Sequence, residues 1–149
     1  MLTRYGGVRP RIKTLRGKQV AAINLGTGRT FDVLVSYDRL HWVKNQGLGA
    51  IKEAGLNVPF VLQHPKGIFE GLCREEDEGR RGYGWWCYCA VPPHEYAENG
   101  DEKPPRPNKI FLVFVNADHV AYNWRWEKVD PDDDRFPIGF QTRFRRQVI

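Results

Sequence analysis

The sequence lacks an apolar run close to the roughly 20 residues that are needed to cross a bilayer. Its first 18 residues are basic and are not followed by an apolar segment. We therefore expect neither a membrane protein nor a Sec signal peptide. P-loop, Rossmann, HExxH and GxSxG motifs are also absent. The sequence thus gives no support for a nucleotide hydrolase, a dehydrogenase, a zinc protease or an α/β-hydrolase.

Cysteine is scarce, since the chain has only Cys73, Cys87 and Cys89. An odd number argues against a complete disulfide framework and favours a reducing compartment such as the cytoplasm. These thiols and His94 are potential zinc ligands, but Cys87 and Cys89 lie in "YGWWCYCAV", which is typical of a strand and not of the tight turn of a zinc knuckle. We expect buried apolar thiols, no metal and no cofactor.

Aromatic and basic residues are abundant. The length of 149 residues is typical of one domain. Of these residues, 13% are aromatic and five are Trp, and the net charge of the chain is +5. Residues 1–18 carry six Lys or Arg and no acid, residues 135–149 carry four Arg and no acid, and acids cluster at 75–78 and 130–134. This segregation is compatible with a polyanion such as RNA, although charge runs are also typical of solvated termini and loops.

The N-terminal third predicts a hairpin and then a helical segment. The segments 18–25 and 29–36 are rich in β-forming residues and are joined by the Gly-containing turn 26–28. Ser36 is a candidate N-cap for a helical segment over 37–54. The apolar stripe of this segment would consist of Leu40, Val43, Leu48 and Ile51.

Glycine and proline interrupt this helical region. Gly47 and Gly49 are expected to divide it into two short helices. Pro59 and Pro65 are expected to prevent a continuous helix over 57–65.

The remainder of the chain predicts strands over 67–74, 83–91, 109–116 and 119–128, with 142–149 as a candidate fifth strand. A helical segment that precedes the strands of a sheet in the sequence indicates an α+β fold. We expect a short helical segment packed on an antiparallel sheet of four to five strands, with an extra N-terminal hairpin. We expect a basic arm over 1–17 and a single domain over 18–149.

One order of features resembles a known class of enzymes. A helix carrying His41 in "DRLHWV", then "HPKGIFEGL" leading into a meander, then a closing strand with Arg resembles the barnase–EndoU–colicin–RelE small ribonucleases, in the layout of their phage- and toxin-associated members. The resemblance covers residues 30–149. It implies metal-independent RNA cleavage through 2′-hydroxyl attack on the concave face of the sheet. It also implies RNA such as tRNA as the substrate, and a cognate antitoxin or immunity protein as a partner.

A polar row in "HVAYNWRWEK" is the sequence feature that best fits such chemistry. Alternate side chains of a strand share one face, so His119, Asn123, Arg125 and Glu127 are expected to point together, with the aromatic residues between them on the other face. RNA cleavage needs a base, an acid and a cation for the developing phosphorane charge. The same alternation is also typical of the solvated face of any antiparallel sheet.

The candidate site combines this row with residues that the resemblance adds. The catalytic candidates are His41, His119, Arg125 and Arg143, and the substrate-binding candidates are His64, Lys66, Asn123, Glu127 and Thr142. Two alternatives stay open. One is a non-catalytic nucleic-acid-binding module that stacks bases on the aromatics of "YGWWCY" and "YNWRW". The other is a protein-interaction domain of the phage accessory or immunity type, with those aromatics as interface anchors.

Overall fold

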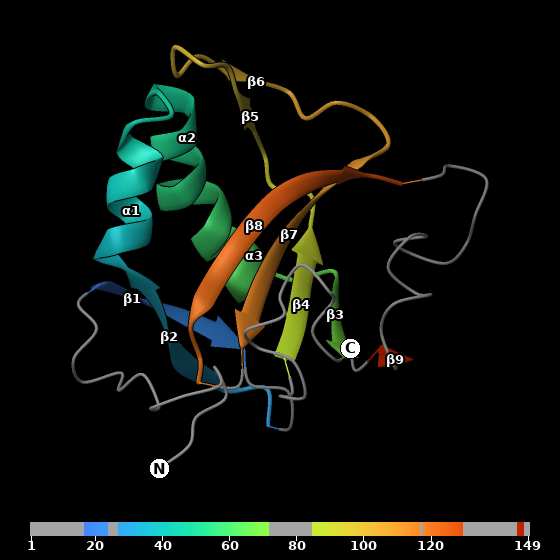
Figure 1. Ribbon diagram of the computed structural model, residues 1–149. Coiled ribbons are helices and arrows are strands. Elements are labelled where there is room, and N and C mark those ends of the chain that lie inside the picture. Colours follow the sequence, from blue (N-terminus) through green and yellow to red (C-terminus); the bar gives the residue numbers. More distant parts are fainter. Residues whose placement is uncertain (1–16, 24–26, 72–84, 117, 130–145, 148–149) are drawn as a thin grey trace.

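The computed structural model describes residues 17–23, 27–71, 85–116, 118–129 and 146–147 (Figure 1). The predicted acidic clusters, residues 1–16 of the basic arm predicted over 1–17, and Cys73 lie outside the described residues. The elements in chain order are β1 (Gly17–Ile23), β2 (Thr30–Ser36), α1 (Tyr37–Lys44), α2 (Leu48–Lys52), the π-helix η2 (Glu53–Asn57), α3 (Val58–Gln63), β3 (Gly67–Gly71), β4 (Trp85–Ala90), β5 (Glu95–Tyr96), β6 (Glu102–Lys103), β7 (Lys109–Asn116), β8 (Ala121–Lys128) and β9 (Arg146–Gln147).

The predicted α+β architecture is confirmed. The main sheet has the strand order β8-β7-β4-β3-β9, and its paired neighbours are antiparallel. β1 and β2 form the expected N-terminal hairpin as a separate two-stranded sheet. The candidate fifth strand over 142–149 is represented among the described residues by the two residues of β9.

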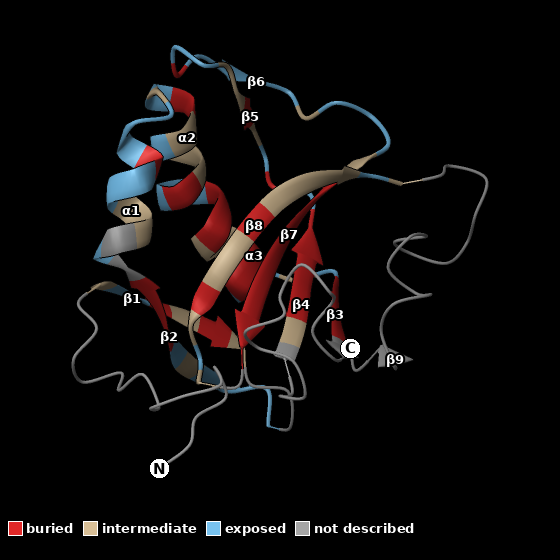
Figure 2. Ribbon diagram, viewed as in Figure 1, coloured by how far each residue is buried: buried red, intermediate tan, exposed pale blue. Residues whose placement is uncertain are grey.

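Each face of the main sheet has its own apolar cluster. On the face that the helices cover, the larger cluster joins residues from the hairpin, the helices and the sheet, including Val58, Val61, Phe111 and Trp124. In Figure 2, buried residues are red along α3 and along the strands β4 and β7. On the opposite face, the smaller cluster consists of Phe69, Cys87, Cys89, Ile110, Leu112 and Phe114. The strands therefore bury both faces, which explains their nearly continuous apolar sequences.

The expectation that 57–65 would not be one continuous helix is confirmed at Pro65, but it was wrong for Pro59, which does not interrupt the helix. α2, η2 and α3 form one continuous helix of 16 residues, and it ends at His64, just before Pro65. Pro59 lies in the first turn of α3, directly after the five-residue π-helix η2. A π turn is wider than an α turn, so it leaves room for the proline ring at the point where an ideal helix would clash with it.

The expected stripe on the helical region is only partly correct. Val43 is buried and Leu40 packs against the larger cluster, but Leu48 and Ile51 are 49% and 40% exposed. Gly47, at φ 110°, does separate α1 from the next helix, whereas Gly49 lies inside α2. The side chains that pack on the sheet come mainly from α3, beyond the expected helical segment.

Two hydrogen bonds fasten the hairpin to the main sheet. The backbone N–H of Leu34 donates to the carbonyl of His119 at 2.9 Å. The hydroxyl of Tyr88, from the centre of β4, donates to the carbonyl of Ile23 at 2.7 Å. Burial raises the pKa of this tyrosine, so the hydroxyl stays a donor.

The long loop between β4 and β7 contains a small hairpin that the sequence analysis missed. β5 and β6 pair in it, and its turn packs on the start of α2. The N–H of Gly49 donates to the carbonyl of Glu98 at 3.2 Å. A Cβ on Gly49 would lie 2.1 Å from the carbonyl oxygen of Ala97. Only glycine therefore allows this close approach of the two backbones.

Two helical glycines provide a matched test of this contact. Gly49→Ala should lower the free energy of unfolding by about 1–3 kcal/mol, because backbone must move to accept the methyl group. Gly55→Ala should raise it by about 0.5–1 kcal/mol, because a Cβ there meets nothing within 4 Å and helical alanine costs less entropy. Urea unfolding followed by tryptophan fluorescence measures both. Equal effects of the two substitutions would contradict the close approach.

Candidate functional site

The predicted polar row of β8 does not lie on one face. A β-bulge interrupts the pairing of β7 and β8, because Val115 pairs with Ala121 but Phe114 pairs with Asn123, and Tyr122 is the extra residue. The aromatic ring of Tyr122 packs on the smaller cluster, together with Phe114. The assumption of strict alternation was therefore wrong for the first half of the strand.

Arg125 and Glu127 do share a face, as expected. The Nε and Nη2 atoms of Arg125 each lie 3.2 Å from Oε1 of Glu127. The guanidinium carbon lies 4.8 Å from the ring centroid of Phe114. Both charged side chains are more than two-thirds buried, at 29% and 25% exposure. They form an ion pair over the smaller cluster, on the sheet face opposite to the helices.

Asn123 turns towards α1 instead. Its Oδ1 accepts a hydrogen bond from Nη2 of Arg39 at 3.1 Å. The guanidinium of Arg39 lies between two indoles, 4.6 Å from the ring centroid of Trp42 and 5.0 Å from that of Trp124. The sequence analysis missed Arg39, and only its position three residues before Trp42 on a helix could have indicated the stack.

His119 lies at the junction of the hairpin and the main sheet. It adopts φ 61° in the turn between β7 and β8, and its ring centroid is 4.6 Å from that of Phe31 and 6.2 Å from that of Trp86. Burial lowers the pKa of His119, and the charge of Asp118 opposes this effect in part. The imidazole thus packs on β2, away from the Arg125–Glu127 pair.

His41, a catalytic candidate, does not face the sheet. Its side chain is exposed on α1, while Leu40 and Val43 face the core. α1 packs on the hairpin and on the helix-covered side of the structure. His41 and Arg125 therefore lie on opposite sides of the main sheet.

The remaining candidates are also dispersed. His64 is the C-cap of α3, is exposed, and lies 5.2 Å from the ring centroid of Phe60. Lys66 is exposed, and its backbone N–H donates to the carbonyl oxygen of Cys89 at 2.7 Å. Thr142 and Arg143 lie outside the described residues.

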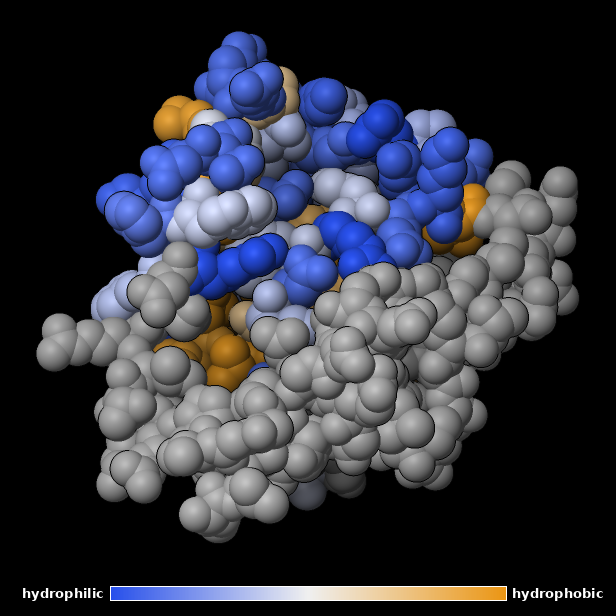
Figure 3. All heavy atoms as spheres, viewed as in Figure 1, coloured by the Kyte–Doolittle hydropathy of each residue, from blue (hydrophilic) through white to orange (hydrophobic). Residues whose placement is uncertain are grey.

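Exposed aromatic and cationic side chains gather instead on α1. Tyr37 is 57% exposed and Trp42 is 52% exposed, and His41 and Lys44 are also exposed. Tyr37, His41 and Lys44 follow at helical spacings of four and three residues, so they share one stripe, with Trp42 beside it. We call these four residues the α1 surface. In Figure 3, pale side chains of intermediate hydropathy lie among hydrophilic ones over the helices.

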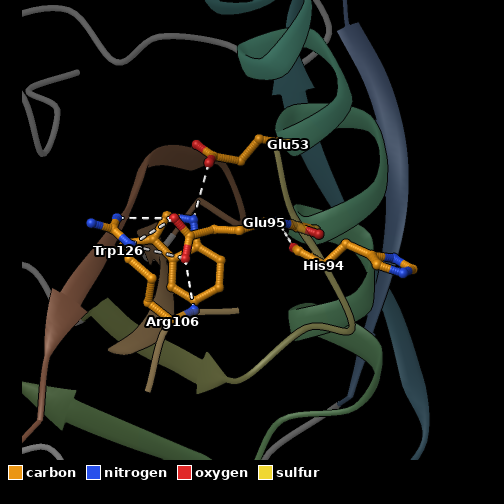
Figure 4. A network of polar contacts seen from close by, with 6 residues as sticks. Glu53, His94, Glu95, Arg106 and Trp126 are labelled. Atoms are coloured by element: carbon orange, nitrogen blue, oxygen red, sulfur yellow. Dashed lines mark hydrogen bonds and ion pairs between the residues drawn. The ribbon is translucent and has the colours of Figure 1, made fainter. Parts of the chain in front are cut away.

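A second polar cluster fastens the β5–β6 hairpin to the helix and the sheet (Figure 4). Glu95 is 5% exposed and accepts from Arg106 through the backbone N–H at 2.9 Å, through Nε at 3.0 and 3.1 Å, and through Nη2 at 2.9 Å. Nε1 of Trp126 donates to Glu53 at 3.2 Å. Nδ2 of the buried Asn57 donates to the carbonyl of His94 at 3.1 Å. Sequence reasoning included none of these carboxylates.

The pKa values of the two carboxylates in this cluster are shifted in opposite directions. Burial raises the pKa of Glu53, the hydrogen bond from Trp126 lowers it in part, and the charge of Glu95 adds to the increase. Burial alone would also raise the pKa of Glu95, but the hydrogen bonds and charge of Arg106 hold it below the ordinary value. Such a divided pair can serve acid–base chemistry, but here Arg106 engages Glu95 on both oxygens, which favours a structural clamp.

The cysteines behave as buried thiols, as predicted. Cys87 and Cys89 are both fully buried and unbridged. Burial raises the pKa of Cys89 to about 12, although a backbone hydrogen bond of Gly67 and the charge of Lys66 counteract it. Within the described ranges, no group of three or more His, Cys, Asp or Glu residues could hold a metal ion. None of the helices in the described part of the chain is both long and apolar enough to cross a membrane.

Comparisons of the chain with protein-family models, with curated proteins and with solved structures find no match.

The opposite pKa shifts of Glu53 and Glu95 predict opposite pH dependences of stability. Glu53 binds its proton more tightly in the folded protein than in the unfolded chain. Its contribution to stability is therefore present below its ordinary pKa of 4.5 and is lost as pH rises through the folded pKa. Glu53→Gln should therefore stabilise the protein at pH 7 and have little effect near pH 4. Urea unfolding across this pH range measures the difference.

Glu95→Gln is the matched opposite. The contribution of Glu95 is present above the ordinary pKa and is lost as pH falls through the depressed folded value. The substitution should cost about 1–3 kcal/mol at pH 7, because it weakens charge-assisted hydrogen bonds to a buried acceptor. This cost should shrink on acidification. A pH-independent effect for either variant would contradict the assigned charge states.

Proposed function

We propose that the protein binds single-stranded RNA through the α1 surface. The observation that carries this proposal is the combination of exposed Tyr37 and Trp42 with His41 and the ammonium group of Lys44 on the same helix. Bases of single strands stack on aromatic side chains, and their phosphates are neutralised by neighbouring cations.

The stack behind Trp42 supports this role. Arg39 lies against one indole face, and Trp124 and Asn123 hold the guanidinium from the sheet side. Trp42 is thereby held in place although it is half exposed. Its side chain would therefore lose little conformational freedom when a base stacks on it. The cation–π contact also lets the positive charge of Arg39 contribute to the local field.

Charge favours RNA over a protein partner at this surface. The chain carries 23 Lys and Arg against 18 Asp and Glu, and Lys44 adds a positive charge to the stripe next to the aromatics. Core positions of protein–protein interfaces are depleted in charged residues. An aromatic surface interleaved with cations is more typical of nucleic-acid binding.

Catalysis of RNA cleavage is a second candidate function. Arg125 and Glu127, adjacent on one sheet face, have two of the chemistries that 2′-hydroxyl attack requires: a cation and a general base. Such an enzyme would not use His41 in the same site, because that residue lies on the other side of the sheet. An imidazole would have to come from elsewhere, or Glu127 would act without one.

Substitutions on α1 test the binding proposal. Trp42→Ala should weaken binding of a labelled single-stranded RNA by about 5- to 150-fold, which corresponds to about 1–3 kcal/mol per stacked base. Trp42→Phe should retain most of the affinity. Lys44→Gln should reduce the salt dependence by roughly 0.7 in log–log slope, the value for one phosphate of a single strand. Fluorescence anisotropy at several salt concentrations measures all three.

Leu56→Ala is the control, because Leu56 is 54% exposed, close to the value for Trp42, but lies outside α1. It should leave RNA binding unchanged. Equal affinity of Trp42→Ala and the unaltered protein for RNA, with both folded, would reject the proposal. Binding that is lost equally in Leu56→Ala would indicate non-specific association.

Incubation of the purified protein with total RNA and with tRNA tests the second candidate. If it cleaves through the 2′-hydroxyl, the products should carry 2′,3′-cyclic phosphate ends, and the activity should persist in EDTA. Arg125→Ala should then reduce the cleavage rate far more than RNA affinity, because its charge acts on the transition state. Arg125→Lys controls for loss of the ion pair. Intact RNA across pH and salt would leave binding as the function.

A further inference from the structure

A pocket of about 220 Å³ opens between the hairpin, α1 and the long helix. Val20 and Val35 of the hairpin, Val43 of α1 and Ala54 of η2 are buried side chains that line it. Leu40, Ile51 and the exposed Gly55 complete the apolar part of the wall.

Two lysines give this pocket a charged margin. Lys18 from β1 and Lys44 from the end of α1 both line it, and both are exposed. Among the described residues that line the pocket, none is acidic. Neither ammonium group forms an ion pair with another described residue. The pocket therefore combines an apolar interior with positive charge from two different elements.

The size of the pocket limits what it can hold. It is larger than the apolar cavity of about 150 Å³ that takes up benzene. It is smaller than the pockets of about 300–1,000 Å³ that enclose drug-sized ligands. A short alkyl chain of about six to eight carbons is larger than benzene and smaller than a drug-sized ligand, so it suits a pocket of this size.

We propose that this pocket is a binding site for a small amphiphilic carboxylate, with the alkyl chain against Val20, Val35 and Ala54 and the carboxylate at Lys18 and Lys44. Charge complementarity selects the head group: an ammonium would be repelled, and a neutral alcohol could accept a hydrogen bond from a lysine but would gain no charge–charge attraction. The pocket shares Lys44 with the α1 surface, but this proposal does not depend on RNA binding, and its test needs no RNA.

Gly55 makes the site testable without damage to the core. Its φ is not in the left-handed region, and a Cβ there meets nothing within 4 Å, so a larger side chain can be introduced without backbone strain. Because Gly55 lines the pocket, Gly55→Leu should place its side chain in the space that the alkyl chain would occupy. Gly55→Ala occupies far less of it and serves as the matched control.

Isothermal titration with butanoate, hexanoate, octanoate, decanoate and octan-1-ol, below micelle formation, provides the measurement. Affinity should rise by about fourfold per added methylene until the pocket is full, and then level off near octanoate. Octanoate should bind more tightly than octan-1-ol. Lys18→Gln should remove most of this preference, and it should leave octan-1-ol binding unchanged.

Gly55→Leu should abolish binding of both probes, whereas Gly55→Ala should retain it. Unfolding curves of each variant show whether the fold is intact. If Gly55→Leu does not fold, the chain-length series and Lys18→Gln still decide the question. The proposal is overturned if octanoate does not bind saturably, if folded Gly55→Leu binds it normally, or if Lys18→Gln leaves the carboxylate preference intact.

Discussion

The burial of Val58, Val61 and Leu62 is the interaction on which the rest of the fold depends. All three are fully buried, and α3 contacts β1 on one side and β4 and β7 on the other. They give the hairpin and the main sheet a common core, although the two sheets share no continuous strand pairing. Burial of each such side chain contributes about 1.5–3 kcal/mol. Three of them are together comparable with the whole net stability of a domain, about 5–15 kcal/mol.

This arrangement divides the polar side chains between two separate places. Arg125 and Glu127 lie over the smaller cluster, whereas the α1 surface lies on the helix side with Arg39 as its link to the sheet. A binding surface on α1 needs only one element and its support. A ribonuclease centre needs several groups on one face, and Arg125 and Glu127 supply two of them. The geometry therefore supports binding more directly than cleavage.

Much of the fold could be predicted because apolar runs and turn residues act locally. The hairpin, the four long strands and the break at Gly47 all follow from short-range patterns. The continuation of the helix through Pro59 could not be predicted, because it depends on the π-helical turn η2. The split of the polar row could not be predicted either, since a bulge exists only relative to a partner strand. The exposure of Trp42 could not be predicted from residue spacing, because it depends on tertiary packing. The same is true of the hydrogen bond between Arg39 and Asn123, which are 84 residues apart.

The bulge at Tyr122 has a consequence for how the protein behaves at high concentration. β8 is the outer strand of the described sheet, next to β7 alone, and such a strand offers backbone groups to which a second chain can add. A bulge bends and twists the strand, and Arg125, Glu127 and Lys128 place charges along its second half. A neighbouring molecule could extend the sheet there only by matching the bend and burying those charges. The irregularity that broke the polar row therefore also makes this edge a poor template for pairing with a second chain.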